Sequence, residues 1–308
     1  MMEFNEFTDR ITGLVQQKMG EGYTVTATKV LKNNDITRTG IVIMEKKDSM
    51  SPTIYLEEPY QQYQDGVDVE EIVEEITVLY EQHSHNIKLD MDFFGDFSQV
   101  EDRIFHKVIN YEKNRELLKS MPYFRWHDLA VVFYYAMQGK AFGRASIPIH
   151  SSHLDMWGKT AEEIYHTARR NMKQKMPELL VPIQKLLDRM PGLRMEESSI
   201  PLYVLTNKEK IFGASAMLYS EKIKDLADKL HSDLLIIPSS LHETLLLSDD
   251  REYDSYRKMV RAVNTTQVDP GMTVLPPILR RSVAIPAFPF PVLPGKALFL
   301  FLISVVFR

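Results

Sequence analysis

Cysteine is absent from this chain of 308 residues. Disulfides, thiolate zinc sites and a cysteine nucleophile are therefore all excluded. Glycine is also scarce, with 13 residues, and neither the G-x-x-x-x-G-K-[ST] nor the G-x-G-x-x-G pattern occurs. The sequence thus contains neither of the phosphate-binding loops that these patterns mark, and we predict no bound cofactor.

The sequence also lacks a secretion signal and a long hydrophobic run. Its start, MMEFNEFTDRITGL, carries acidic and polar residues where a signal peptide has a basic start and an apolar stretch. The most apolar stretch, at 297–307, is shorter than the roughly 20 residues that a membrane-spanning helix needs. We therefore predict a cytoplasmic protein without a transmembrane segment.

The sequence also has no excess of positively charged residues. The chain has 37 Lys and Arg against 42 Asp and Glu, which gives a formal net charge of -5. This balance argues against an extensive positively charged surface that would bind nucleic acid, so we expect no nucleic-acid partner. The apolar fraction of 44% and the charged fraction of 26% are those of an ordinary soluble globular protein.

Residues 1–85 are predicted to form a small α+β unit of helix, hairpin and helix. Apolar residues at a spacing of three to four predict a first helix over 3–19, which glycines then end. Alternating patterns predict strands at 23–27 and 37–44, with a third at 53–56. Asp68 is placed to cap a second helix.

Residues 86–100 have a weak pattern and are interpreted as a linker, and residues 101–270 are predicted to form a larger α+β domain with a mixed sheet. Thr160 and Glu163 have the spacing of a capping box, in which each side chain bonds to the other residue's amide and so starts a helix. The other expected elements are strands at 104–109, 128–137 and 145–149 and helices at 111–119 and 179–190.

The clearest strand and helix signals lie in residues 201–247. Short apolar runs at 202–205 and 211–218, separated by a charged turn, predict a β-hairpin. Ser220 is the expected N-cap of an amphipathic helix that follows. The wholly apolar run at 234–237 is too short for a helix and predicts a strand covered on both faces.

The segment 271–308 differs in composition from the rest of the chain. It contains no aspartate or glutamate, is rich in proline and ends in ALFLFLISVVFR. Three interpretations remain open: a buried strand, a partner-binding tail, and a non-native segment of the kind that an altered reading frame would produce.

Ser240, His242 and Glu243 follow the predicted buried strand, where sheets commonly present reactive side chains. A serine with a histidine and a carboxylate nearby has the composition of a nucleophile, a base and an orienting acid. On a strand, however, Ser240 and His242 would share one face while Glu243 points away, and no G-x-S-x-G elbow precedes them. The alternative is a polar turn in which His242 bonds to the backbone.

A second polar cluster contains His150, His153 and Asp155. Two histidines three residues apart on a helix lie on one side, and Asp155 could join them as a ligand or supporting partner. Neutral imidazole suits zinc, iron or nickel. The alternative needs no metal, because Ser151 or Ser152 can cap a helix that Trp157 anchors in the core.

Four segments carry a resemblance to a known family: SIPIHSSHLDMWGKTAEEIYHTARRN at 146–171, PLYVLTNKEKIFGASAMLY at 201–219, DLLIIPSSLHETLLL at 233–247 and MVRAVNTTQVDP at 259–270. In these segments the chain resembles a family of uncharacterised bacterial proteins, found mostly in Gram-positive anaerobes. The resemblance covers residues 1–270. Because the family has no established activity, the resemblance implies no catalytic residue.

Two functional hypotheses remain after these observations. The first is a non-catalytic cytoplasmic interaction or regulatory protein with an unknown protein partner. The alternative is a hydrolase, metal-assisted in one version, that would combine Ser240, His242 and Glu243 with His150 and His153. This alternative requires the two clusters to meet within hydrogen-bond reach, directly or through a water.

Overall fold

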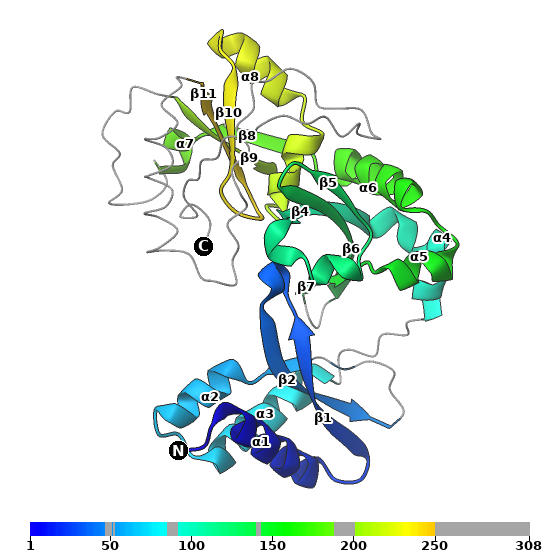
Figure 1. Ribbon diagram of the computed structural model, residues 1–308, viewed down its shortest axis with the longest axis vertical. Helices are drawn as coiled ribbons and strands as arrows, with labels where there is room; N and C mark the ends of the chain where they lie inside the picture. Colours follow the sequence, from blue (N-terminus) through cyan, green and yellow to red (C-terminus); the bar gives the residue numbers. More distant parts are fainter. Residues whose placement is uncertain (47–50, 52, 85–91, 140–142, 188–200, 250–308) are drawn as a thin grey trace. The chain divides into compact units, whose positions relative to one another are not determined.

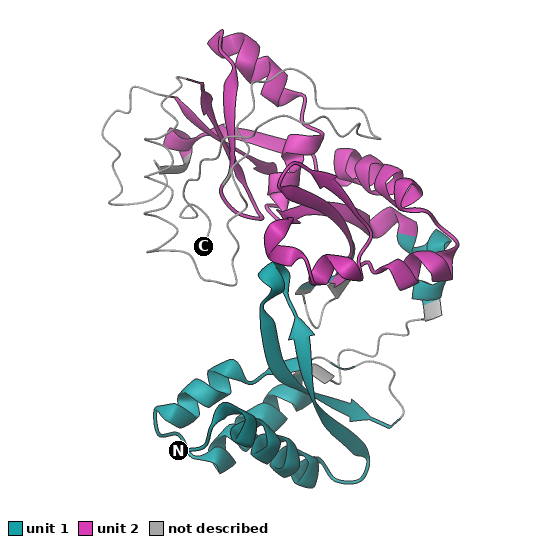
Figure 2. Ribbon diagram, in the orientation of Figure 1, with its two compact units in different colours: residues 1–100, 136–146 teal, residues 101–135, 147–308 magenta. Residues whose placement is uncertain are grey.

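The computed structural model describes the chain except for residues 47–50, 52, 85–91, 140–142, 188–200 and 250–308 (Figure 1). Helices and antiparallel sheets are both present, which confirms the predicted α+β class. The chain divides into two compact units (Figure 2), unit 1 with residues 1–100 and 136–146 and unit 2 with residues 101–135 and 147–308. The predicted tail at 271–308 lies outside the described residues.

Unit 1 is built on a three-stranded antiparallel sheet. Its strands lie in the order β1 (Tyr23–Leu31), β2 (Thr37–Glu45) and β3 (Thr53–Tyr55). The sheet is accompanied by the helices α1 (Phe4–Met19), α2 (Glu57–Gln64) and α3 (Val69–Ser84), of which α2 was not indicated by the sequence pattern. Apolar side chains of α1, β2 and α3 form one buried core: Phe7, Ile11, Val15, Ile41, Ile43, Ile72 and Ile76.

Local interactions fix the ends of these helices. Gly20 follows α1 with a φ of 79°, a conformation that glycine adopts without steric cost. The Gln16 side chain then ties α1 to the sheet, because its Oε1 accepts the Val25 amide at 2.8 Å. Asp68 Oδ1 accepts the Glu70 amide at 2.9 Å, which is the capping interaction predicted for α3.

Three short helices follow residues 85–91, which are not described. They are η2 (Asp92–Gly95), α4 (Phe97–Val100) and η3 (Glu101–Arg103). The linker proposed for residues 86–100 stays a prediction.

The second sheet of the chain has the order β4 (Ile104–Asn110), β6 (Leu129–Gly139) and β5 (Tyr123–Trp126), and β7 (Gly143–Pro148) also pairs with β6. Helix α6 (Ala161–Lys175) packs against β4 (Figure 1). Its Asn171 side chain donates to the Ile104 carbonyl at 2.8 Å. The predicted capping box starts this helix, with the Glu163 amide 3.2 Å from Thr160 Oγ1 and the Thr160 amide 2.9 Å from Glu163 Oε2.

The third sheet has the order β10 (Leu234–Pro238), β11 (Thr244–Ser248), β9 (Leu202–Asn207) and β8 (Glu178–Pro182). The predicted strand at 234–237 is confirmed, and its four residues are buried. The expectation of a mixed sheet is corrected, because every strand pair described in this sheet is antiparallel. Strand β11 lies between β10 and β9, and β9 lies between β11 and β8, so strands that run in the same direction are not neighbours.

Three predicted elements have a different structure. Residues 111–119 form two short 3-10 helices, η4 (Glu112–Asn114) and η5 (Leu117–Lys119), and the Asn110 side chain accepts the Lys113 amide at 2.8 Å in competition with helical bonding. The predicted helix at 179–190 begins instead as strand β8, because the run pairs with β9; α7 (Ile183–Leu187) follows, and residues 188–190 lie outside the described residues. Residues 213–218 form the 3-10 helix η6 (Gly213–Leu218) instead of a hairpin strand.

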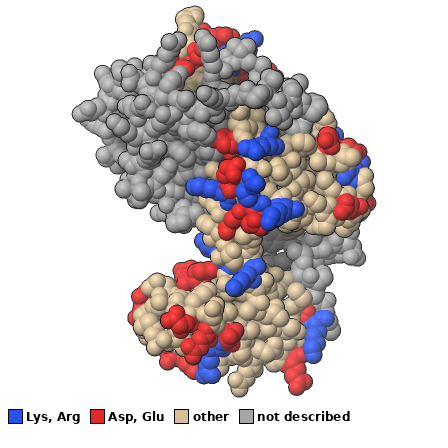
Figure 3. Space-filling view, viewed as in Figure 1, with Lys and Arg blue, Asp and Glu red and all other residues tan. Residues whose placement is uncertain are grey.

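The helices α5 (Ser151–Trp157) and α8 (Lys222–Leu230) complete unit 2. Basic residues of α6 pair with acidic residues of other elements, and Figure 3 shows cationic and acidic side chains next to one another on one face of the molecule. The pairs are Arg170 with Glu101 at 3.4 Å, Lys175 with Asp102 at 2.9 Å and Lys173 with Glu221 at 3.6 Å. No helix within the described ranges combines the length and the apolar character that crossing a membrane requires.

Candidate functional site

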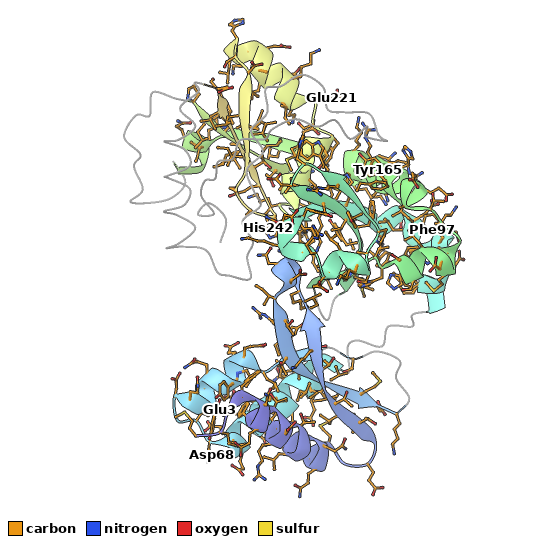
Figure 4. The ribbon with its side chains drawn as sticks, viewed as in Figure 1. Glu3, Asp68, Phe97, Tyr165, Glu221 and His242 are labelled. Carbon is orange, nitrogen blue, oxygen red and sulfur yellow. The ribbon has the colours of Figure 1, made fainter. Side chains whose placement is uncertain are left out.

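The first predicted cluster lies on the loop that joins β10 to β11 (Figure 4). This loop contains Ser239, Ser240, His242 and Glu243, of which His242 is partly exposed and the other three are buried. The amides of Ser239 and Ser240 both donate to the Glu243 carbonyl, at 3.2 and 3.3 Å, so the backbone closes on itself. The structure therefore brings the three predicted residues together on one tight turn.

The imidazole of His242 is bonded to the backbone of a neighbouring loop. Its Nδ1 accepts the Phe212 amide at 3.2 Å, and its ring stacks on the Phe212 ring with centroids 5.7 Å apart and an interplanar angle of 12°. Burial lowers the pKa of His242, a backbone hydrogen bond with Lys210 opposes that shift, and the Lys107 charge lowers the pKa further. A nitrogen that already accepts an amide proton is not available as a general base.

The hydrogen bonds of Ser240 and Glu243 also do not connect these side chains to the His242 ring. Ser240 Oγ accepts the His242 amide at 3.0 Å, and Glu243 Oε1 accepts the Ser239 hydroxyl at 3.3 Å. Burial raises the pKa of Glu243 to about 7, although the Ser239 bond works in the opposite direction. These bonds do not form the serine, histidine and carboxylate sequence of a hydrolase triad. The hydrogen bonds of this loop therefore do not support the hydrolase alternative.

The loop instead binds the strained segment around Phe212 and holds it against the sheet. Lys210 and Phe212 have φ values of 56° and 49°, which are uncommon for residues other than glycine. A Cβ at Gly213 would lie 2.5 Å from the His242 carbonyl oxygen and 2.1 Å from Thr206 Oγ1, so only glycine fits there. We call the contact set of His242 with Lys210, Phe212 and Gly213 the histidine clamp.

The second predicted cluster lies at the start of α5. The amide of His150 donates to His153 Nδ1 at 3.1 Å, and His150 Nδ1 lies 3.2 Å from Ser120 Oγ. The two rings have centroids 5.6 Å apart, while Asp155 is an exposed residue farther along the same helix. Burial lowers the pKa of His153, with a smaller contribution from His150. In this arrangement both histidines cap the start of α5.

The two clusters bond to different segments of unit 2. The loop after β10 is held by residues 206–214, whereas the start of α5 is held by Ser120, and α5 lies well apart from β10 and β11 in Figure 1. No group of three or more His, Cys, Asp or Glu side chains suited to a metal ion occurs among the residues that the structure describes.

Several residues that the sequence did not single out surround the clamp. Lys107 Nζ lies 4.5 Å from the centroid of the Phe212 ring, and the Tyr134 ring lies 4.9 Å from the same ring. Sequence proximity does not indicate these two contacts, because Lys107 and Tyr134 belong to strands of another sheet.

Fold and site together define an α+β protein of two units in which the polar loop between β10 and β11 forms an internal clamp. The family model described as a family of unknown function (DUF5688) matches residues 4–273, so the chain belongs to that family. This confirms the predicted resemblance of residues 1–270 to an uncharacterised family. No curated protein and no solved structure matches the chain.

Proposed function

We propose that this chain is a non-catalytic interaction or regulatory protein of the cytoplasm that acts through a protein partner. The observation that carries the proposal is the hydrogen bond from the Phe212 amide to His242 Nδ1. This bond uses the one ring nitrogen of a neutral imidazole that could accept a proton from serine. In a hydrolase, side chains such as Ser240, His242 and Glu243 would supply the nucleophile, the base and the acid. In this protein they stabilise a loop.

The proposal makes His242 a residue of stability and not of catalysis. His242→Ala leaves the Phe212 amide without its acceptor, and an unpaired buried polar group costs about 1–3 kcal/mol. We expect a fall of about 2 kcal/mol in the free energy of unfolding, measured by urea denaturation. His166→Ala is the matched control because His166 is exposed on α6, and it should change stability by less than about 0.5 kcal/mol.

A serine-reactive fluorophosphonate probe tests the catalytic alternative directly. We expect no labelling of the full-length protein that depends on Ser240, because this hydroxyl lacks a base. The Ser240→Ala variant is the reference, and peptide mass spectrometry identifies any labelled serine. Labelling at Ser240 in the wild type, lost in Ser240→Ala and His242→Ala, would overturn the proposal.

A further inference from the structure

A cluster of tyrosine and arginine side chains lies on the surface of unit 2. We call it the Tyr–Arg patch, and it consists of Tyr111, Arg115, Tyr123 and Arg125. The Tyr111 and Tyr123 rings have centroids 5.8 Å apart. The guanidinium carbons of Arg125 and Arg115 lie 3.9 and 5.2 Å from the centroid of the Tyr111 ring. The two cations are therefore gathered around one aromatic ring.

The two guanidinium groups converge on a single carboxylate. Arg115 Nη1 lies 3.4 Å from Glu112 Oε2, and Arg125 Nη2 lies 3.6 Å from Glu112 Oε1. Each oxygen thus faces a different arginine, which shows that the space between them accommodates a carboxylate. Both distances exceed the roughly 2.7–2.9 Å of a strong charge-assisted hydrogen bond. The Glu112 carboxylate therefore interacts only weakly with the two arginines.

The patch is accessible and partly ordered before any partner binds. The side chains of Arg115 and Arg125 are 57% and 53% exposed, and Tyr123 is 36% exposed. Arg125 Nε donates to the His127 carbonyl at 2.9 Å, which limits the freedom of this side chain. Tyrosine and arginine dominate the binding energy of many protein interfaces, and side chains ordered in advance lose less entropy on binding.

The patch lies beside a terminal strand. Tyr123 and Arg125 belong to β5, which ends the order β4, β6, β5 in the described part of the chain. An extended segment can add to such an edge through its own backbone, while alternate side chains contact the face of the sheet. The charge of the patch, two guanidinium groups against one carboxylate, selects for acidic side chains in that segment.

We propose that the Tyr–Arg patch is the docking surface for an acidic, extended segment of a partner protein, in which a partner carboxylate replaces Glu112 between Arg115 and Arg125. This inference rests on the proposed function, because it supplies the surface that a binding protein requires. A nucleic acid fits less well, since the chain has a net charge of -5 and Glu112 interrupts the positive charge of the patch.

The test uses the full-length protein and a fluorescent peptide of alternating glutamate and threonine, with about six residues, the length of a typical strand. Fluorescence anisotropy should show saturable binding that weakens as salt increases. Arg115→Gln with Arg125→Gln should weaken binding by at least about tenfold. The control, Lys113→Gln with Lys119→Gln, removes the same charge from exposed positions of the same segment that are not part of the patch, and it should retain the wild-type affinity.

Glu112 provides the sharper comparison. Glu112→Gln removes the internal competitor and should tighten peptide binding by up to about fivefold, the range of an exposed ion pair. Glu116→Gln changes the net charge equally, but the ion pair of Glu116 is with Lys119, at 2.6 Å. A purely long-range effect of charge would tighten binding equally in both variants, and that result would overturn the proposal.

Three other results would also overturn it: no saturable binding to the wild type, equal losses in the arginine and lysine variants, or tighter binding of oligothymidylate than of the peptide. Thermal unfolding checks that each variant is folded. The test is independent of the serine-probe experiment. Labelling of Ser240 would remove the proposed function whatever the peptide does, while a failed peptide test leaves the histidine clamp unaffected.

Discussion

At the residue scale, unit 2 contains a buried histidine that is quite different from His242. His106 on β4 has no exposed surface, and neither of its ring nitrogens has a hydrogen-bond partner within the described structure. Its ring stacks on Tyr165 of α6 with centroids 6.0 Å apart. Burial lowers the pKa of His106 to about 3, and the nearby charge of Arg169 contributes in the same direction. The imidazole is thus held neutral in an apolar setting.

His106→Leu should therefore stabilise the protein. The substitution removes two buried polar atoms that lack partners, and we expect a gain of about 1 kcal/mol in the free energy of unfolding at neutral pH. In the wild type only the unfolded chain takes up a proton at His106 as pH falls below 6.5, so stability is lost between that pH and about 3. The advantage of His106→Leu should grow over this window in urea denaturation.

His166→Leu is the control for this comparison, because it removes an exposed histidine from the neighbouring helix. It should leave the pH dependence of stability unchanged. A loss of stability in His106→Leu at neutral pH would mean that the imidazole nitrogens have partners, for example a buried water, whose loss costs more than the burial of the ring.

At the element scale, the turn between β9 and η6 depends on one glycine. A Cβ at Gly213 would lie 2.8 Å from the Asn207 amide as well as 2.5 Å from the His242 carbonyl oxygen, and both are backbone atoms that cannot move independently. Gly213→Ala should therefore lower the free energy of unfolding by about 2 kcal/mol or more. Gly13→Ala is the contrasting variant, since nothing lies within 4 Å of its Cβ position in α1.

We expect Gly13→Ala to raise the free energy of unfolding of unit 1 by up to about 1 kcal/mol, because alanine loses less backbone entropy in a helix. Circular dichroism during urea denaturation measures both variants. Equal and small effects of the two substitutions would contradict the close packing of the histidine clamp.

Elements whose cause is local could be predicted from the sequence. The capping box of Thr160 and Glu163 needs only two side chains and two amides of one helix turn. The strand at 234–237 was recognisable because its apolar run is too short for a helix and is bounded by a proline, which favours a strand covered on both faces. The 3-10 helix at 213–218 was not predictable, because its start depends on the approach of the His242 carbonyl from a loop some 30 residues later.

The candidate residues were partly predictable for the same reason. Their types suggested hydrolase chemistry, but their hydrogen-bond partners come from residue 212 and its neighbours, which sequence proximity does not indicate. The Tyr–Arg patch could not be predicted at all. Tyr111 and Arg125 meet only because β4 and β5 both pair with β6.

At the scale of the whole molecule, the stability of unit 2 should depend on pH through buried groups with opposite effects, and His106 and Glu243 are one of each kind. Of these two groups, only His106 still binds protons differently in the folded and unfolded states below pH 4.5, and its contribution makes the protein less stable as the pH decreases there. Glu243 has a folded pKa of about 7 against an ordinary value of 4.5. Its protonated form is favoured in the folded state, so its contribution is complete below 4.5 and is lost as pH rises through 7.

Glu243→Gln tests this assignment, because the amide oxygen can still accept the Ser239 hydroxyl but carries no charge. Relative to the wild type, the variant should gain stability as pH rises from 4.5 to 7 and hold a constant advantage above that range. Glu162→Gln, at an exposed position of α6, should show no such change. Urea denaturation at several pH values measures both. If Glu243→Gln is equally displaced from the wild type at all pH values, Glu243 has no raised pKa, and the loop after β10 is more open to water than its burial indicates.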